Sequence, residues 1–332
     1  MNRRRLLQAT ALGAFSTVLA PTSNAQGRSA ALPDLKKAIT DFTTLSPGRA
    51  AACISIEEDN GSRSTVHAAD PDQPLFVGSA VKTFILAQYL REVEAGRLSE
   101  DTQVAVGPEV WSPGSPVFMH LTGTTPARSA LEAMIAHSDN TGTDIALNAA
   151  GADQVRQLIK TAGLTHTLIP DSTRKLFSYL AGAPNGVDIG WAGMEKMAKD
   201  IMPGKPRKPV NDHQTMMSTA GELTRWYEQA LAGKYFKKHE TLAEFKRISA
   251  MANAMPMMVP EDVMAYGKGG SIDWGDFHCF CGAGQMVQTS RRTSFCFILN
   301  WTGADGTVPT MLESFKKQSR HVLSLAANSR AA

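Results

Sequence analysis

Serine and lysine residues recur in three short strings of this sequence. The strings are Ser79-Ala-Val-Lys82, Ser138-Asp-Asn140 and Lys268-Gly-Gly270, in that order along the chain. A serine hydroxyl is a poor nucleophile at neutral pH, so it needs a neighbouring base, a proton path and hydrogen-bond donors for the developing oxyanion. Each string can supply one of these parts, and together they predict a serine acyl-transfer site.

The first string carries the candidate nucleophile and base. Ser79 and Lys82 are three residues apart, so on a helix they share a face and the lysine amine can hydrogen-bond the hydroxyl. Lys82 acts as a base only when neutral. Burial beside a second cation, which Lys268 can provide, would lower the pKa of Lys82 in the required direction.

Each string alone has an ordinary structural interpretation. S-x-x-K occurs about once in a chain of this length by composition, and it is typical of an exposed helix pair. Ser138-Asp-Asn140 is typical of a helix N-cap or an Asx turn, and Lys268-Gly-Gly270 of a strand bulge. The ordered set of three favours the catalytic interpretation over all of these.

The set resembles the signature of the class A β-lactamases and their penicillin-binding relatives, which is S-x-x-K, S-D-N and K-T-G. The stretch 76–98 is similar to the nucleophile helix of that family, and 133–144 to its S-D-N junction. Trp111-Ser-Pro113 stands where the family has an aromatic residue before Ser-Pro at the mouth of the cleft. The resemblance extends from about residue 34 to 326 and is weakest between 165 and 260.

This resemblance implies a role for each matching residue. Ser79 would attack the substrate carbonyl, Lys82 would take its proton, and Ser138 would relay a proton to the leaving nitrogen. Asn140 would orient the substrate amide and hold Lys82. Lys268 would add positive potential for an anionic group of the substrate.

The strand after Lys268 would complete the site. Gly270 and Ser271 would line the bound substrate, and the backbone N–H groups of Ser79 and Ser271 would form the oxyanion hole. Trp111 would either stack on the substrate or pack a loop, and the sequence leaves both alternatives open.

Two departures from the family signature affect the predicted reaction. Gly269 stands where the family has a hydroxyl residue, and Ser271 is a candidate replacement. Class A enzymes also carry E-x-x-L-N after S-D-N, whose glutamate activates the deacylating water, and no such string lies between Ser138 and Lys268. The carboxylates available in that segment, each of which also fits a helix cap or a solvated charge, are Asp171, Asp188, Glu195 and Asp212.

Three functions remain after these departures. The first is an exported serine hydrolase of class A β-lactamase type, which cleaves a β-lactam or related amide through an acyl-enzyme on Ser79. The second is a penicillin-binding protein, D-amino-acid peptidase, amidase or esterase with slow or glutamate-independent deacylation. The third is a non-catalytic receptor for peptidoglycan or an antibiotic, although a pure binder has no need of a neutral lysine.

The first 25 residues have the pattern of a signal peptide. Arg3 to Arg5 form a basic start, an apolar run spans 9–20, and Ser23-Asn-Ala25 offers small residues for cleavage. Paired arginines before leucines are typical of twin-arginine export, so the predicted location is the periplasm or the exterior. The chain has 34 basic and 31 acidic residues, and the signal peptide holds three arginines and no acid. We therefore expect a neutral mature chain, which binds neither nucleic acid nor membrane.

The four cysteines and His278 do not predict a metal site or a cofactor. Cys279 and Cys281 share one face of a strand and cannot easily bond each other. Cys296 could pair with either of them, or all four thiols, Cys53 included, could be free and buried. His278 alternates with the cysteines along the strand and so faces the other way. The sequence also lacks a P-loop and a G-x-G-x-x-G after a strand.

The pattern of elements predicts one α/β domain over residues 26–332. Alternating residues around Asp59-Asn-Gly61 indicate a hairpin, and three more strands and a helix over 310–325 follow near the C-terminus. We expect a β-lactamase-like fold with two lobes. The sheet lobe, 34–70 and 260–326, has five antiparallel strands with terminal helices, and the helical lobe is 71–259. A mature chain of this length buries a full core alone, so we expect a monomer.

Overall fold

A five-stranded antiparallel sheet forms the frame of the protein. The computed structural model describes residues 32–68 and 70–329, and its strands lie in the order β2-β1-β9-β8-β7. Their bounds are β1 (Gly48–Glu58), β2 (Arg63–Ala68), β7 (Met264–Trp274), β8 (Phe277–Gln288) and β9 (Arg291–Thr302). The predicted α/β class and the five-stranded antiparallel sheet are confirmed.

The first two strands form the predicted hairpin. Gly61 supplies the positive φ of 81° that this tight turn requires, and the N–H of Ser62 donates to Oδ1 of Asn60 at 2.8 Å. β9 is buried along nearly its whole length because it lies at the centre of the sheet, with β1 on one side and β8 on the other.

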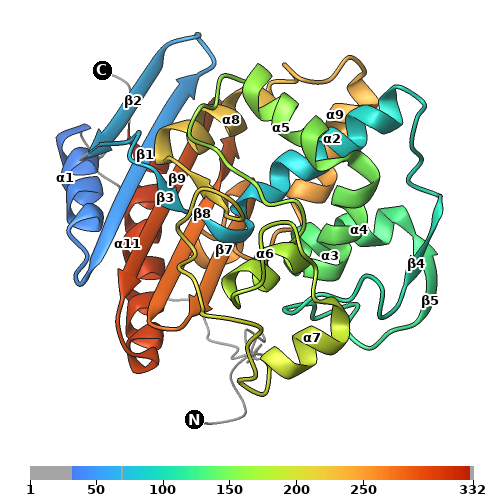
Figure 1. Ribbon diagram of the computed structural model, residues 1–332. Helices are drawn as coiled ribbons and strands as arrows, with labels where there is room; N and C mark the ends of the chain where they lie inside the picture. Colours follow the sequence, from blue (N-terminus) through green and yellow to red (C-terminus); the bar gives the residue numbers. More distant parts are fainter. Residues whose placement is uncertain (1–31, 69, 330–332) are drawn as a thin grey trace, which may run out of the picture.

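Terminal helices cover one face of the sheet. α1 (Leu32–Thr43) packs against α11 (Val308–Asn328), and both contact the sheet (Figure 1). The ring of Phe42 lies 5.0 Å from that of Phe297 and 5.7 Å from that of Phe315, edge to face in both pairs. These contacts join the two ends of the chain, and α11 confirms the helix expected over 310–325.

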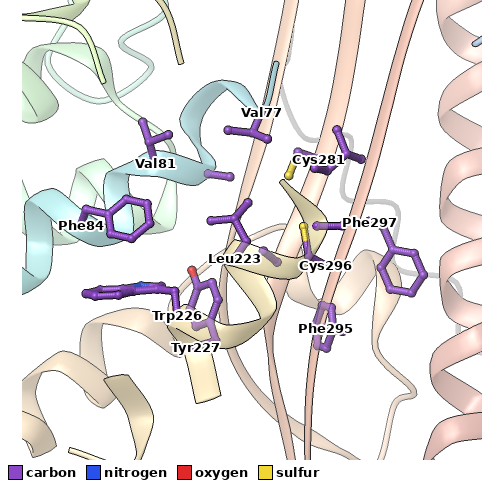
Figure 2. Packing of buried hydrophobic residues seen from close by; sticks show 14 of the residues in the cluster. Val77, Val81, Phe84, Leu223, Trp226, Tyr227, Cys281, Phe295, Cys296 and Phe297 are labelled. Atoms are coloured by element: carbon purple, nitrogen blue, oxygen red, sulfur yellow. The ribbon is translucent and has the colours of Figure 1, made fainter. Parts of the chain in front are cut away.

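The other face is covered by α8 (Ala220–Leu231), which carries the largest buried side chains. Figure 2 shows Leu223, Trp226 and Tyr227 of α8 packed beside residues of β8 and β9. Cys281 and Cys296 lie in this cluster. All four cysteines are buried and free, which agrees with the free-thiol alternative.

The remaining helices lie beside the β7 edge of the sheet (Figure 1). They are 3-10 helix η1 (Gly78–Val81), α2 (Lys82–Glu94), α3 (Ala127–Ala136), α4 (Asn140–Ala150), α5 (Ala152–Thr161), α6 (Thr173–Leu180), α7 (Gly190–Met197), α9 (His239–Ser249) and α10 (Met255–Met258); η2 (Asp305–Thr307) precedes α11. Short strand pairs join β3 (Leu75–Phe76) to β6 (Met217–Ser218), and β4 (Gln103–Val106) to β5 (Gly123–Pro126).

The predicted signal peptide, residues 1–25, lies outside the described residues. Among the helices that are described, none combines the length and the apolar character needed to cross a bilayer.

Candidate active site

Ser79 lies in η1, and α2 begins at Lys82. The turn starts at Gly78, whose φ of +52° is unfavourable for a residue with a side chain. Ser79 is half-buried, whereas Lys82 is fully buried. The nucleophile helix predicted from the sequence therefore begins as a 3-10 turn that presents Ser79 and continues as the α-helix that buries Lys82.

The Lys82 amine is held by the S-D-N string. Nζ donates to the backbone carbonyl of Ser138 and to Oδ1 of Asn140, both at 2.7 Å. Both acceptors can only receive a hydrogen bond, and a neutral amine has two N–H groups and one lone pair. A neutral Lys82 would therefore use both hydrogens on these acceptors and keep its lone pair. In the described part of the chain, Nζ is hydrogen-bonded to this string rather than to Ser79, which differs from the simple helix-pair expectation.

The Ser138 hydroxyl lies between two lysine amines. Lys268 Nζ is 3.0 Å from Ser138 Oγ, and Lys82 Nζ is 3.5 Å from the same atom. Lys268 also donates to the carbonyl of Gly269 at 2.7 Å. Ser138 adopts a φ of 59°, a conformation that is costly for a non-glycine residue and clusters at functional sites. The structure thus brings together all three predicted strings.

Asp139, the central residue of the second string, fixes the others in place. Its Oδ1 accepts from the N–H of Gly142 at 2.8 Å as the N-cap of α4. Its Oδ2 accepts from the N–H groups of Val117 and Phe118 at 2.8 and 3.0 Å. Asp139 therefore caps α4, as the N-cap interpretation of this string predicts, and also holds the backbone at Val117 and Phe118.

Burial governs the charges of the two lysines. Burial lowers the pKa of Lys82 well below its usual value, and nearby Lys268 lowers it further, against the charges of Asp139 and Asp144, which raise it. Burial also lowers the pKa of Lys268 to about 7. Two ammonium groups this close disfavour each other's charge, which favours the neutral Lys82 that the predicted chemistry needs.

Strand β7 runs against the Ser79 turn without room for side chains. A Cβ on Gly270 would lie 2.0 Å from the carbonyl oxygen of Val77 and 2.9 Å from the N–H nitrogen of Ser79. A Cβ on Gly78 would lie 2.9 Å from the nitrogen of Ser271. Glycine at both positions lets the backbone amides of Ser79 and Ser271 lie at this close approach, where the oxyanion hole is predicted.

The structure leaves little room for a side chain at Gly269, where the family has a hydroxyl residue. A Cβ there would lie 2.5 Å from the Cβ of Ala254, so a larger residue would require the segment before α10 to move. Ser271, the proposed replacement, is exposed.

Trp111 belongs to an aromatic cluster, defined as Trp111, His120 and Trp191. The Trp111 ring lies 5.5 Å from His120 and 5.6 Å from Trp191, and His120 lies 6.0 Å from Trp191, all edge to face. Trp111 Nε1 donates to the carbonyl of Leu121 at 2.8 Å. These contacts meet the loop-packing alternative, while part of the Trp111 side chain stays accessible.

The four carboxylates considered for water activation are either paired with arginine or exposed. Asp171 pairs with Arg156 and accepts from Gln214 Nε2 at 2.8 Å. Burial raises the pKa of Asp171, but these hydrogen bonds outweigh burial and leave the pKa lowered. Asp188 is held by the guanidinium of Arg174. The two others, Glu195 and Asp212, are exposed.

Sequence reasoning missed a buried polar network behind Asn140. Ser112 Oγ lies 2.7 Å from Thr173 Oγ1, which donates to the carbonyl of Asn140 at 3.3 Å. Asp144 of α4 accepts from the N–H of Thr173 at 2.6 Å. Asp144 stands four residues after Asn140, so helical spacing was the available signal for it. Nothing in the spacing of the hydroxyl residues could have shown that they meet.

Residues 34–292 match a family described as the Beta-lactamase enzyme family. The chain belongs to this family. The predicted family resemblance is thereby confirmed, and membership supports a serine hydrolase that acts on amide bonds. No curated protein sequence matches the chain.

Solved structures with the same fold are distant in sequence. PBP-A is 17% identical with a TM-score of 0.65, covering 90% of this chain and 97% of its own. The chromosome-encoded β-lactamase of Vibrio parahaemolyticus is 15% identical with a TM-score of 0.64, covering 87% and 98%. A β-lactamase from Chitinophaga pinensis is 17% identical with a TM-score of 0.66, covering 88% and 97%. At this level of identity the likeness shows the fold.

Proposed function

We propose that this β-lactamase-family protein is an exported serine hydrolase that is acylated on Ser79 by a β-lactam or a related amide. The observation that carries the proposal is the position of Ser138 Oγ between Lys82 and Lys268. This arrangement supplies a base and a proton relay next to the candidate nucleophile.

The proposed reaction conserves protons along this path. Lys82 takes the Ser79 proton as Oγ bonds to the substrate carbonyl, and the Ser79 and Ser271 amides stabilise the oxyanion. When the tetrahedral intermediate collapses, the C–N bond breaks and Ser138 gives its proton to the leaving nitrogen. Ser138 is then reprotonated by the ammonium of Lys82. The product of this half-reaction is an ester of Ser79.

The lysine charges select an anionic substrate. Lys268, whose pKa burial lowers to about 7, becomes more readily protonated when a carboxylate binds beside it. Asn140, whose Nδ2 donates to the Pro113 carbonyl at 2.6 Å and whose Oδ1 accepts from Lys82, would hold the substrate amide from the opposite side.

Slow release of the acyl group is the second candidate behaviour, and a specific observation favours it. The carboxylates between α5 and β6 that were considered for water activation are either paired with arginine, as Asp171 and Asp188 are, or exposed. A mutant of the similar protein PBP-A was solved as an acyl-enzyme complex with penicillin G. We therefore expect a penicillin-binding type of kinetics, in which acylation outruns hydrolysis.

A time course of intact-protein mass tests both steps. The mature chain is mixed with excess benzylpenicillin, with Ser79→Ala in parallel. The expected result is a Ser79-dependent mass increase equal to that of the whole penicillin, which decays slowly after free antibiotic is removed. Rapid decay would favour β-lactamase turnover. Absence of an adduct together with unchanged penicillin would overturn the proposal and move the scaffold to another substrate or to a receptor function.

A second variant tests the base. Lys82→Ala should slow acylation by roughly 100-fold or more in protein that remains folded. Acylation at the original rate would remove Lys82 from its role as base and leave Ser79 activation unexplained.

Export is tested separately from catalysis. Replacing Arg4 and Arg5 with lysine should keep the precursor inside the cell if the twin-arginine route is used. N-terminal sequencing of the exported protein should begin near Gln26. Export that is unaffected by the arginine replacement would indicate a different route.

A further inference from the structure

Asp144 is a buried carboxylate that neither the family signature nor the proposed reaction uses. It lies on α4 one helical turn after Asn140 and is 3% exposed. Its Oδ1 accepts from the N–H of Thr173 at 2.6 Å and its Oδ2 from the N–H of Arg174 at 3.0 Å. These two donors belong to the first turn of α6, where a helix leaves N–H groups without partners of its own.

Asp144 and Ser172 together complete the start of α6. Ser172 Oγ accepts from the N–H of Lys175 at 3.0 Å, and its carbonyl accepts from Leu176 at 3.0 Å. The N–H groups of the first three residues of α6 thus all have a side-chain acceptor, and Asp144, from another helix, accepts two of these hydrogen bonds. The carboxylate also carries a negative charge toward the positive end of the α6 dipole.

The same carboxylate is connected to the Lys82 amine. Thr173, which Asp144 fixes, contacts Ser112 Oγ and donates to the carbonyl of Asn140. Asn140 Oδ1 in turn accepts from Lys82 at 2.7 Å. We propose that Asp144 is a positioning residue for the acylation site, holding the first turn of α6 against Asn140 and controlling the charge of Lys82.

The electrostatics support this role. Burial raises the pKa of Asp144 to about 6, although its hydrogen bonds with Thr173 and Arg174 and the charge of Lys82 act to lower it. In return, ionised Asp144 raises the pKa of Lys82 against burial and Lys268. Protonating or removing this carboxylate therefore favours the neutral, basic form of Lys82.

Other charged groups on the neighbouring helices are directed elsewhere. Asp139 also acts on Lys82 but spends both oxygens on N–H groups. The guanidinium of Arg174 is held by Asp188 and the carbonyls of Pro108 and Glu109. On α3 and α5 the pairs are Arg128 with Glu100 and Asp101, Glu132 with Arg247, and Arg156 with Asp153 and Asp171.

The test is a direct titration of Lys82. Protein with 13Cε-labelled lysine is titrated by NMR, and Lys82 is assigned by its loss in Lys82→Arg. In Asp144→Asn, which keeps the size and one acceptor, the Lys82 titration should move to lower pH by about half a unit or more. Arg156→Gln is the matched control. It removes the ion pair with Asp171, which lies just before α6, and it should leave the Lys82 titration unmoved.

The wild-type protein gives a second readout that needs no variant. The Lys82 resonance should show an additional inflection near pH 6 as Asp144 is protonated. An unmoved titration in folded Asp144→Asn, or a single wild-type inflection if that variant does not fold, would reduce Asp144 to a helix cap.

The kinetic consequence rests on the proposed function. The acidic limb of the acylation rate should shift to lower pH in Asp144→Asn, in step with the NMR titration. If the wild type is not acylated at any pH, the proposed function fails, whereas the NMR titration still decides the role of Asp144.

Discussion

Lys268 donates a 3.0 Å hydrogen bond to the hydroxyl of Ser138, across the 130 residues that separate them in the chain. The contact joins the β7 edge of the sheet to the junction of α3 and α4. The third string follows the second so late in the sequence because β7, which carries Lys268, comes after most of the helices along the chain. Ser138 Oγ, the proton relay of the proposed reaction, is therefore positioned by both the sheet and the helices.

Replacing Ser138 with alanine tests this relay. Ser138→Ala should lower the second-order rate constant of acylation by roughly 100-fold or more, because the leaving nitrogen loses its proton donor. The measurement is the adduct formation rate by intact mass, with exposed Ser62→Ala as the control. A rate within a few-fold of the wild type would show that the leaving nitrogen is protonated by another group.

Local sequence pattern was sufficient to predict the strands of the sheet, and the order of the three strings was sufficient to predict that they come together. The hairpin at Gly61 shows alternation and the late strands are apolar runs, whereas the three strings indicated a site only as an ordered set. The contacts behind Asn140 could not be predicted, because Ser112 and Thr173 are brought together by the packing of distant segments. The missing deacylation glutamate was visible as an absent string, but the pairing of Asp171 with Arg156 required coordinates.

Lys268 should make stability depend on pH. Its folded pKa of about 7 lies below the ordinary 10.5, so between these values the unfolded chain holds a proton that the folded chain has released. The contribution of Lys268 to the free energy of unfolding therefore rises with pH through this window, by up to about 1.4 kcal/mol per pH unit. Lys268→Met should be more stable than the wild type near pH 7, with a difference that shrinks toward pH 10.

Urea unfolding of both proteins at several pH values measures this effect. Lys199→Met, at an exposed position, is the matched control and should parallel the wild type. A constant difference between Lys268→Met and the wild type from pH 7 to 10 would mean that Lys268 is charged in the folded protein across this range.

Gly270 should tolerate no side chain. In Gly270→Ala the new Cβ would overlap the Val77 carbonyl at 2.0 Å and press on the Ser79 amide, so β7 and the Ser79 turn must separate. We expect a loss of about 1–3 kcal/mol in the free energy of unfolding and a large fall in the acylation rate. Gly306→Ala is the control because nothing lies within 4 Å of its Cβ. Normal acylation in Gly270→Ala would place the oxyanion hole elsewhere.

The aromatic cluster separates the two alternatives for Trp111. Its ring packs edge to face against Trp191 at 5.6 Å, so Trp111→Ala and Trp191→Ala should be non-additive in stability, with a coupling energy of about 0.5–1.5 kcal/mol in a double-mutant cycle.

If Trp111 only packs its loop, the two single variants should change the apparent affinity for benzylpenicillin to a similar extent, since both loosen the same contact. If Trp111 also stacks on the substrate, Trp111→Ala should weaken affinity several-fold more than Trp191→Ala. Saturation of the acylation rate with penicillin concentration gives the affinity, and urea unfolding gives the coupling. Additive stability effects would contradict the packing of Trp111 against α7.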